Sequence, residues 1–200
     1  MENIKICKPK LVVIEGVDCV GKTTLAKKIA LELGYVYYYL PQPPLSTIRK
    51  EIEDMKNVET RFFYYLATCV AAQPEIKSML LSGQPVVIDR YVYSTFAMHK
   101  VLGATTASVN WKILPVTRPS LGILLTANEK ARENRKINRG GDANVIDSRI
   151  EQQANLLNIA QEEYRSFGDL VEIETSLLSA NEVFAKVRQI ILEGEQSCTT

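Results

Sequence analysis

The feature that most constrains the fold of this chain is an eight-residue pattern near its amino terminus. The pattern reads Gly16, Val17, Asp18, Cys19, Val20, Gly21, Lys22 and Thr23. The apolar run Leu11–Ile14 before it predicts a buried strand, and apolar residues at helical spacing after Lys22 predict a helix that stops at Gly34. Glycines and a lysine–threonine pair between a strand and a helix are typical of a phosphate-binding loop.

The chemistry of this loop follows from its residue types. Glycine lets the backbone curl so that successive N–H groups point at phosphate oxygens, and the following helix directs its positive end at the same anion. The Lys22 ammonium can reach the β and γ phosphates, and the Thr23 hydroxyl can bind Mg²⁺. We therefore expect residues 16–24, Thr24 included, to bind the phosphates of ATP. A tight turn that merely needs glycine would not explain Lys22 and Thr23.

Further strands and helices alternate along the rest of the chain. Short apolar or aromatic runs predict strands at Tyr35–Leu40, Pro85–Ile88, Leu121–Leu125 and Leu170–Ile173. Helical spacing predicts helices over Asn57–Leu81, kinked or split at Pro74, and over about Asn128–Asn138 and Asp147–Phe167. Ser179 and Glu182 form a possible capping box for a last helix. The alternation predicts an α/β fold, a three-layer α/β/α sandwich around a five-stranded parallel sheet, as one domain over residues 1–200.

Charge and cysteine content exclude several classes of protein. The net charge is +1, from 24 basic and 23 acidic residues, which argues against nucleic acid or a membrane surface as a partner. No apolar stretch is long enough for a transmembrane helix. The four cysteines, Cys7, Cys19, Cys69 and Cys198, have no zinc-site spacing. We expect a cytoplasmic protein with free thiols.

A second group of polar residues, Asp89-Arg90-Tyr91, follows a predicted buried strand. In open α/β sheets, ligands bind at the carboxyl ends of the strands. Asp89 could hold Mg²⁺ through water, and Arg90 could bridge a donor and an acceptor phosphate. A surface ion pair at the strand end is the alternative.

Together, Glu15-Gly16-Val17-Asp18 and the run from Asp89 through Ser94 to Ala97 resemble the thymidylate kinase family of P-loop nucleoside monophosphate kinases. The resemblance implies ATP and Mg²⁺ as cofactors, nucleotide substrates and a homodimer. It also implies that Asp18 meets the 3′-hydroxyl of the acceptor sugar, Arg90 binds the acceptor phosphate, Asp89 supports Mg²⁺ and Ser94 lines the base pocket.

A helical lid is expected at about residues 128–146. Its basic residues Arg132, Arg135, Lys136 and Arg139 recur at helical spacing before Gly140 and Gly141. Some members of the family carry a catalytic arginine in the phosphate-binding loop, and others carry it in the lid. The loop residue after Asp18 is Cys19, which is not basic, so this chain resembles the members whose arginine lies in the lid. Arg135 and Arg139 match that pattern best, and a solvated basic helix face is the alternative.

The departures from the family lie on the acceptor side. Its base-stacking aromatic residue and the arginine four residues later correspond to Tyr64 and Thr68. Its acceptor-phosphate arginine corresponds to Pro43, and Arg49 is the candidate to take its place. Met98 stands where the family often has an aromatic residue, and it can be core filler as well as a base contact.

The sequence thus favours ATP-dependent phosphorylation of a nucleoside monophosphate, thymidylate or a related pyrimidine nucleotide, to the diphosphate. The catalytic residues would be Lys22, Arg90, Arg135 and Arg139. Two alternatives stay open. One is a small-molecule kinase acting on a hydroxyl, with Glu15 or Asp18 as the base. The other is a nucleotide-binding module without catalysis.

Overall fold

The computed structural model describes residues 10–138 and 154–196 of the chain. Its strands form one sheet in the order β2-β3-β1-β4-β5, and every neighbouring pair is parallel. The strands are β1 Leu11–Glu15, β2 Val36–Tyr39, β3 Val86–Asp89, β4 Leu121–Thr126 and β5 Leu170–Glu174. Each of them lies where an apolar or aromatic run predicted it, so the five-stranded parallel sheet is confirmed.

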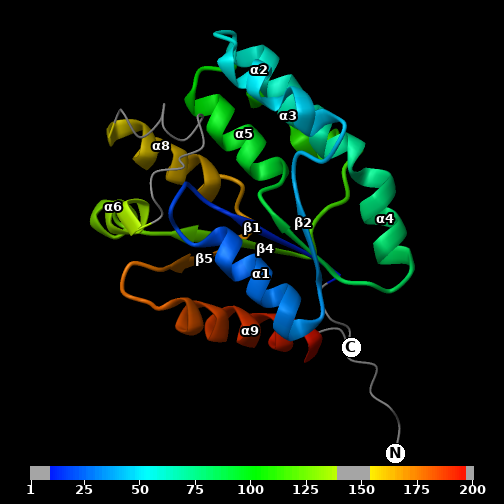
Figure 1. Ribbon diagram of the computed structural model, residues 1–200, viewed down its shortest axis with the longest axis vertical. Helices are drawn as coiled ribbons and strands as arrows, with labels where there is room; N and C mark the ends of the chain where they lie inside the picture. The colour runs from blue at the N-terminus through cyan, green and yellow to red at the C-terminus, as the bar shows by residue number, and fades with distance from the viewer. Residues whose placement is uncertain (1–9, 139–153, 197–200) are drawn as a thin grey trace, which may run out of the picture.

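Helices cover both faces of the sheet. They are α1 Lys22–Leu33, α2 Arg49–Asp54, α3 Val58–Ala71, α4 Gln73–Leu81, α5 Val92–Val101, α6 Glu129–Asn138, α8 Ala154–Arg165 and α9 Ala180–Gln196. Figure 1 shows α1 and α9 side by side on one face, with α3, α5 and α8 on the other. This arrangement is the predicted three-layer α/β/α sandwich.

The core lies where the central strand passes between the two helical layers. Val12, Val13 and Ile14 of β1 are fully buried. A strand covered on both faces needs a continuous apolar run, which is why this segment shows no polar alternation. β1 pairs with β3 on one side and with β4 on the other, so the residues that follow β1 and β3 emerge next to each other.

The helix expected over residues 57–81 is split near Pro74, as predicted: α3 ends at Ala71, and α4 begins at Gln73 with Pro74 in its first turn. Proline is tolerated there because the first-turn N–H groups have no partner within the helix. The sequence did not predict α5, whose residues are buried from Val92 to His99. A helix surrounded by protein has no polar face and therefore no amphipathic period.

The last helix begins as predicted. The Ser179 hydroxyl accepts a hydrogen bond from the backbone N–H of Glu182, and the Glu182 carboxylate accepts one from the backbone N–H of Ser179. This reciprocal pair confirms the capping box. In the described parts of the chain, no helix combines the length and the apolar composition that a membrane span requires.

Candidate active site

The sheet topology brings two sequence motifs together. The loop after β1 and the residues after β3 lie at the same edge of the sheet, because Ile14 and Asp89 are register partners in neighbouring parallel strands. There the Thr23 hydroxyl donates a hydrogen bond to Asp89 Oδ2 at 2.5 Å. Residues 66 positions apart in the sequence thus form one polar centre.

The loop after β1 requires its first glycine. Gly16 has φ of 130°, and a Cβ built on it would lie 2.3 Å from the carbonyl oxygen of Leu125. Any other residue would therefore both clash with β4 and adopt a strained backbone. Gly21, with φ of 103°, precedes the first residue of α1. The tight loop directs its backbone and the amino end of α1 at one small volume, as phosphate binding requires.

Lys22 lies folded against its own loop. Its Nζ donates a hydrogen bond to the carbonyl oxygen of Val17 at 2.6 Å and lies 3.7 Å from Asp18 Oδ1. The side chain is only 5% exposed. An ammonium held in this way can exchange the carbonyl oxygen for an oxygen of a bound phosphate.

Arg90 joins the two motifs. Its Nη2 donates to Asp18 Oδ1 at 2.6 Å, and its Nη1 donates to the Gly16 carbonyl at 3.1 Å and to Ser94 Oγ at 3.4 Å. The backbone of Arg90 has φ of 65°, a conformation that is uncommon for residues other than glycine. The predicted partners Asp18, Arg90 and Ser94 therefore do lie together.

These residues open onto a cavity of about 310 Å³. It is lined by Asp18, Cys19, Gly21, Lys22, Thr23, Tyr37, Tyr39, Leu40, Arg49, Tyr65, Thr68, Cys69, Asp89, Arg90, Tyr91, Ser94, Thr95, Met98 and His99. The lining combines charged side chains with aromatic, thiol and hydroxyl groups, a mixture that suits a nucleotide with a charged end and a flat base.

Several predicted loop residues do not line this cavity. Val17 and Val20 are buried in the core. Thr24 and Val20 line a second cavity of about 250 Å³ on the other side of the loop. Their contribution to phosphate binding would come from the loop backbone rather than from their side chains.

The expected stacking residue, Tyr64, does not line this cavity. Its hydroxyl donates a hydrogen bond to the carbonyl of Leu45, whereas the cavity is lined by Tyr65. Neighbouring residues on a helix point about 100° apart, so Tyr64 and Tyr65 face different directions from α3. If Tyr65 is the aromatic position, the position four residues later is Cys69, which also lines the cavity. Thr68 lines it too, with its hydroxyl donating to the Tyr65 carbonyl.

Ser94 connects the cavity to a buried carboxylate. Its hydroxyl donates to Glu15 Oε2 and lies 2.9 Å from the Tyr164 hydroxyl, while the Tyr91 backbone N–H donates to Glu15 Oε1. Glu15 has no exposed surface. Burial raises the pKa of Glu15 to about 7, although hydrogen bonds from Ser94 and Tyr91 and the nearby Arg90 oppose the shift.

The cavity residues that were not expected to contact the acceptor include His99, Cys69 and Tyr37. His99 Nδ1 lies 2.7 Å from the Thr95 carbonyl, and burial lowers the pKa of its imidazole to about 4. Burial also raises the pKa of the Cys69 thiol to about 12. The pKa of Tyr37 rises to about 12 through burial and the neighbouring Asp89 carboxylate. The thiol and the imidazole are thus uncharged at neutral pH, and no pattern in the sequence marks these positions.

The residues predicted to hold a metal fit that task. Asp89 Oδ1 is buried, and no group in the described parts of the chain hydrogen-bonds to it. Such an unsatisfied carboxylate oxygen is costly unless a ligand completes its contacts. Thr23 and Asp89 supply hydroxyl and carboxylate oxygens, the ligand type that Mg²⁺ takes. Within residues 10–138 and 154–196 no cluster of three or more acidic, histidine or cysteine side chains could hold a metal. Water and the phosphates of a bound nucleotide are the further ligands that Mg²⁺ commonly takes.

Of the two predicted lid arginines, only Arg135 lies among the described residues; Arg139 falls outside them. Arg135 Nη1 donates to the Thr175 hydroxyl at 3.0 Å and to the Cys19 carbonyl at 3.3 Å, and its Nη2 donates to the Thr175 carbonyl at 2.6 Å. These bonds attach α6 to the phosphate loop. Arg135 lines the second cavity together with Thr24, Leu178 and Val183, rather than the cavity that contains Lys22 and Arg90.

Comparison with known proteins agrees with this geometry. The sequence profile of a family described as thymidylate kinase matches residues 14–189. A probable thymidylate kinase of Archaeoglobus fulgidus is 34% identical over 140 residues, which cover 65% of this chain and 70% of that protein. One from Picrophilus torridus is 27% identical over 92% of this chain and 94% of its own. Among solved structures, thymidylate kinase from Candida albicans superposes with a TM-score of 0.75 at 19% identity, covering 94% of both chains.

Proposed function

Because the chain belongs to the thymidylate kinase family and is therefore an ATP-dependent nucleoside monophosphate kinase, we propose that it transfers the γ-phosphoryl group of ATP to thymidylate. The observation that carries this proposal is the shared cavity. Lys22 of the phosphate loop and Arg90 of the second motif line it together with Tyr65. A donor phosphate on Lys22 and an acceptor phosphate on Arg90 would then meet without water between them.

The mechanism is an in-line displacement that the side chains support by charge and position. The acceptor phosphate is already ionised, so the reaction needs no strong general base. Lys22 neutralises charge on the transferring group, and Arg90 aligns the two phosphates. Asp18 orients Arg90 through the 2.6 Å ion pair and can also accept a hydrogen bond from the acceptor sugar.

We include Mg²⁺, held by Thr23 and Asp89, in this proposal. The support is the pairing of these two oxygen ligands and the unsatisfied Asp89 Oδ1. When bound, the ion would offset negative charge on the β and γ phosphates of ATP. Tyr37 lies beside Asp89 and would keep that carboxylate oriented.

The adenine of ATP would occupy the second cavity, beside the loop. This cavity joins loop residues Gly21 and Thr24 to the apolar side chains Leu178 and Val183, and it contains Arg135. A guanidinium stacks well on an aromatic ring. Arg135 would thus couple ATP binding to the position of α6. Arg139, which lies outside the described residues, remains a predicted catalytic residue.

A kinase that acts on a hydroxyl is less well supported. It would need a carboxylate base beside the acceptor, and both candidates have other partners. Asp18 forms an ion pair with Arg90, and Glu15 is fully buried behind Ser94.

Three other expectations from the sequence remain predictions: a single domain with a lid, a homodimer and a cytoplasmic location.

The experiment is to measure ADP formation from ATP and Mg²⁺ with thymidylate, other pyrimidine monophosphates and thymidine in turn. We expect thymidylate to raise the rate well above the rate without an acceptor, and thymidine to leave it unchanged. Turnover of thymidine in place of thymidylate would refute the proposal. A different monophosphate as the sole substrate would refute the choice of thymidylate alone.

A further inference from the structure

Glu15 is a buried carboxylate that the proposed mechanism does not use. It is the last residue of β1, has no exposed surface and lies directly before the phosphate-binding loop. Removing a charged group from water is costly unless hydrogen bonds satisfy that group. Buried ionisable residues with shifted pKa values gather at functional sites. The contacts of Glu15 therefore indicate what its carboxylate does.

The first contact of Glu15 holds the backbone on one side of Arg90. Glu15 Oε1 accepts a hydrogen bond from the backbone N–H of Tyr91 at 2.9 Å. On the other side, the backbone N–H of Arg90 donates to the carbonyl oxygen of Ile14 at 3.0 Å. Because a φ of 65° is unfavourable for a residue with a Cβ, the backbone of Arg90 needs such restraints. Two neighbouring residues of β1 supply them.

The second contact of Glu15 reaches the side chain of Arg90 through Ser94. The Ser94 hydroxyl donates its only hydrogen to Glu15 Oε2. The Tyr164 hydroxyl lies 2.9 Å from Ser94 Oγ, so Tyr164 is the donor in that contact. Arg90 Nη1 donates to the same oxygen at 3.4 Å. Ser94 thus gives its hydrogen to Glu15 and receives two hydrogen bonds, which leaves it no donor for a base or a sugar.

Tyr164 brings a third element into this group. It is fully buried near the end of α8, and α8 packs against α5, the helix that carries Ser94 (Figure 1). Glu15, Ser94 and Tyr164 therefore connect β1, α5 and α8 by hydrogen bonds behind the cavity. A phosphate-binding arginine must be held within a small fraction of its reach, because a misplacement of about 1 Å slows phosphoryl transfer strongly. Three packed elements provide a rigid support of this kind.

We propose that Glu15 is a positioning residue that fixes Arg90, through the Tyr91 backbone and the Ser94 hydroxyl, in the orientation that binds the acceptor phosphate. This inference rests on the proposed function, because it takes Arg90 to bind that phosphate. It also assigns Ser94 to the support of Arg90 and not to recognition of the base.

The test asks whether Glu15 acts through Arg90. Calorimetry gives the dissociation constants of thymidylate and thymidine for the wild type, Glu15→Gln, Arg90→Met and the double variant, at about pH 8, where the Glu15 carboxylate is ionised. We expect Glu15→Gln to weaken thymidylate binding by roughly 10-fold, because an amide cannot accept both hydrogen bonds. Thymidine binding should change by less than about 2-fold, because thymidine lacks the phosphate. In the Arg90→Met background, Glu15→Gln should change thymidylate binding by less than about 2-fold, because the residue through which it acts is gone.

Ser94→Ala separates support of Arg90 from contact with the base. It removes the hydroxyl and keeps the Tyr91 N–H bond to Glu15, so it should weaken thymidylate binding by less than Glu15→Gln does and leave thymidine binding unchanged. Glu59→Gln is the matched control. Glu59 likewise accepts hydrogen bonds from a backbone N–H and a hydroxyl, both of Thr105, but it does not line the cavity. Its substitution should leave both dissociation constants unchanged.

Two results would overturn the inference. One is equal weakening of thymidylate and thymidine binding by Glu15→Gln or Ser94→Ala. The other is the same loss of thymidylate binding with and without Arg90. If Glu15→Gln does not fold, Ser94→Ala in the two Arg90 backgrounds decides the question. If the wild type prefers another nucleoside monophosphate, that nucleotide and its nucleoside replace thymidylate and thymidine. A phosphate-specific loss without any turnover would refute the proposed function and leave the role of Glu15 intact.

Discussion

Glu15 and His99 are buried ionisable residues with opposite pKa shifts near the acceptor side of the cavity. Burial raises the pKa of Glu15 to about 7 and lowers that of His99 to about 4. Arg90 acts on Glu15, while Arg61 and Glu59 act on His99. The Glu15 carboxylate binds a proton more tightly in the folded protein than in the unfolded chain, so its contribution lowers the free energy of unfolding as the pH rises from about 4.5 to 7. The His99 imidazole binds a proton less tightly in the folded protein, so its contribution lowers the free energy of unfolding as the pH falls from about 6.5 to 4.

Because the two contributions oppose each other, single substitutions should reveal them. We expect the free energy of unfolding of Glu15→Gln to rise more steeply with pH than that of the wild type, between about pH 5 and 7. His99→Gln should shift the slope in the opposite direction. Each effect can reach on the order of 3 kcal/mol across its window. Urea unfolding at several pH values measures the slopes, and three parallel profiles would contradict the assigned shifts.

Asp89 provides a second prediction for single residues. Asp89→Asn keeps the size of the side chain and removes the charge that the proposed Mg²⁺ requires. We expect kcat to fall by about 100-fold or more, as loss of one transition-state contact does. Half-saturation should also require more Mg²⁺. Glu75→Gln is the control, because Glu75 accepts a hydrogen bond from Tyr38 on the same strand as Tyr37 but does not line the cavity. An unchanged Mg²⁺ dependence in Asp89→Asn would rule out Asp89 as the metal site.

Among the elements, α6 connects the lid region to the phosphate loop through one side chain. Arg135 bonds to the backbone of Cys19 in the loop and to Thr175 after β5. If adenine lies in the adjoining cavity, loss of Arg135 removes both a stacking surface and the attachment of α6. Arg135→Ala should then raise the KM for ATP by roughly 10-fold or more and leave the dissociation constant of thymidylate nearly unchanged.

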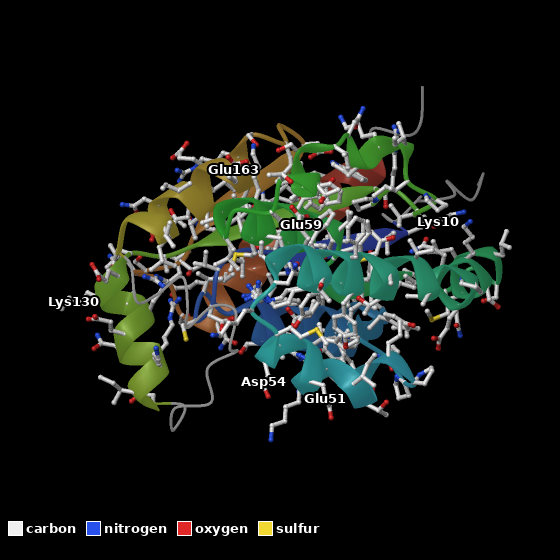
Figure 2. All side chains as sticks on the ribbon, turned by 90° about the horizontal axis from the view of Figure 1, so that it is seen from above. Lys10, Glu51, Asp54, Glu59, Lys130 and Glu163 are labelled. Atoms are coloured by element: carbon white, nitrogen blue, oxygen red, sulfur yellow. The ribbon has the colours of Figure 1, made fainter. Side chains whose placement is uncertain are left out.

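Lys130→Ala serves as the control for this measurement, since Lys130 projects outward from the same helix (Figure 2). Initial rates at varied ATP give the KM, and calorimetry gives thymidylate affinity. An Arg135→Ala enzyme that binds ATP normally but binds thymidylate poorly would place Arg135 on the acceptor side instead.

The elements also show where sequence reasoning succeeds and where it fails. The strands were predictable because each is a short apolar or aromatic run between turn residues. α5 was not, because a helix buried from Val92 to His99 has no polar face to reveal its period. The sequence also does not reveal that Tyr65 lines the cavity and Tyr64 does not, because four aromatic residues follow one another from Phe62 to Tyr65.

For the whole molecule, the sheet topology explains why the loop after β1 and the residues after β3 form one site, as the sequence analysis expected. Parallel strands β1 and β3 are neighbours, so residues after them share one edge, and Thr23 and Asp89 meet there. What the sequence could not supply is any contact that depends on how α2, α3 and α5 pack together. Arg49, Cys69 and His99 line the cavity only because these helices converge on it.

The central claim is that this cavity brings the γ phosphate of ATP to a nucleoside monophosphate. The most direct measurement is to incubate the protein with thymidylate, Mg²⁺ and ATP that is radiolabelled at its γ phosphate, and to identify the labelled product. We predict that the label appears in the terminal phosphate of thymidine diphosphate, and that Lys22→Met abolishes its formation. Label found only in inorganic phosphate, or retained in ATP while ATP remains bound, would contradict the claim.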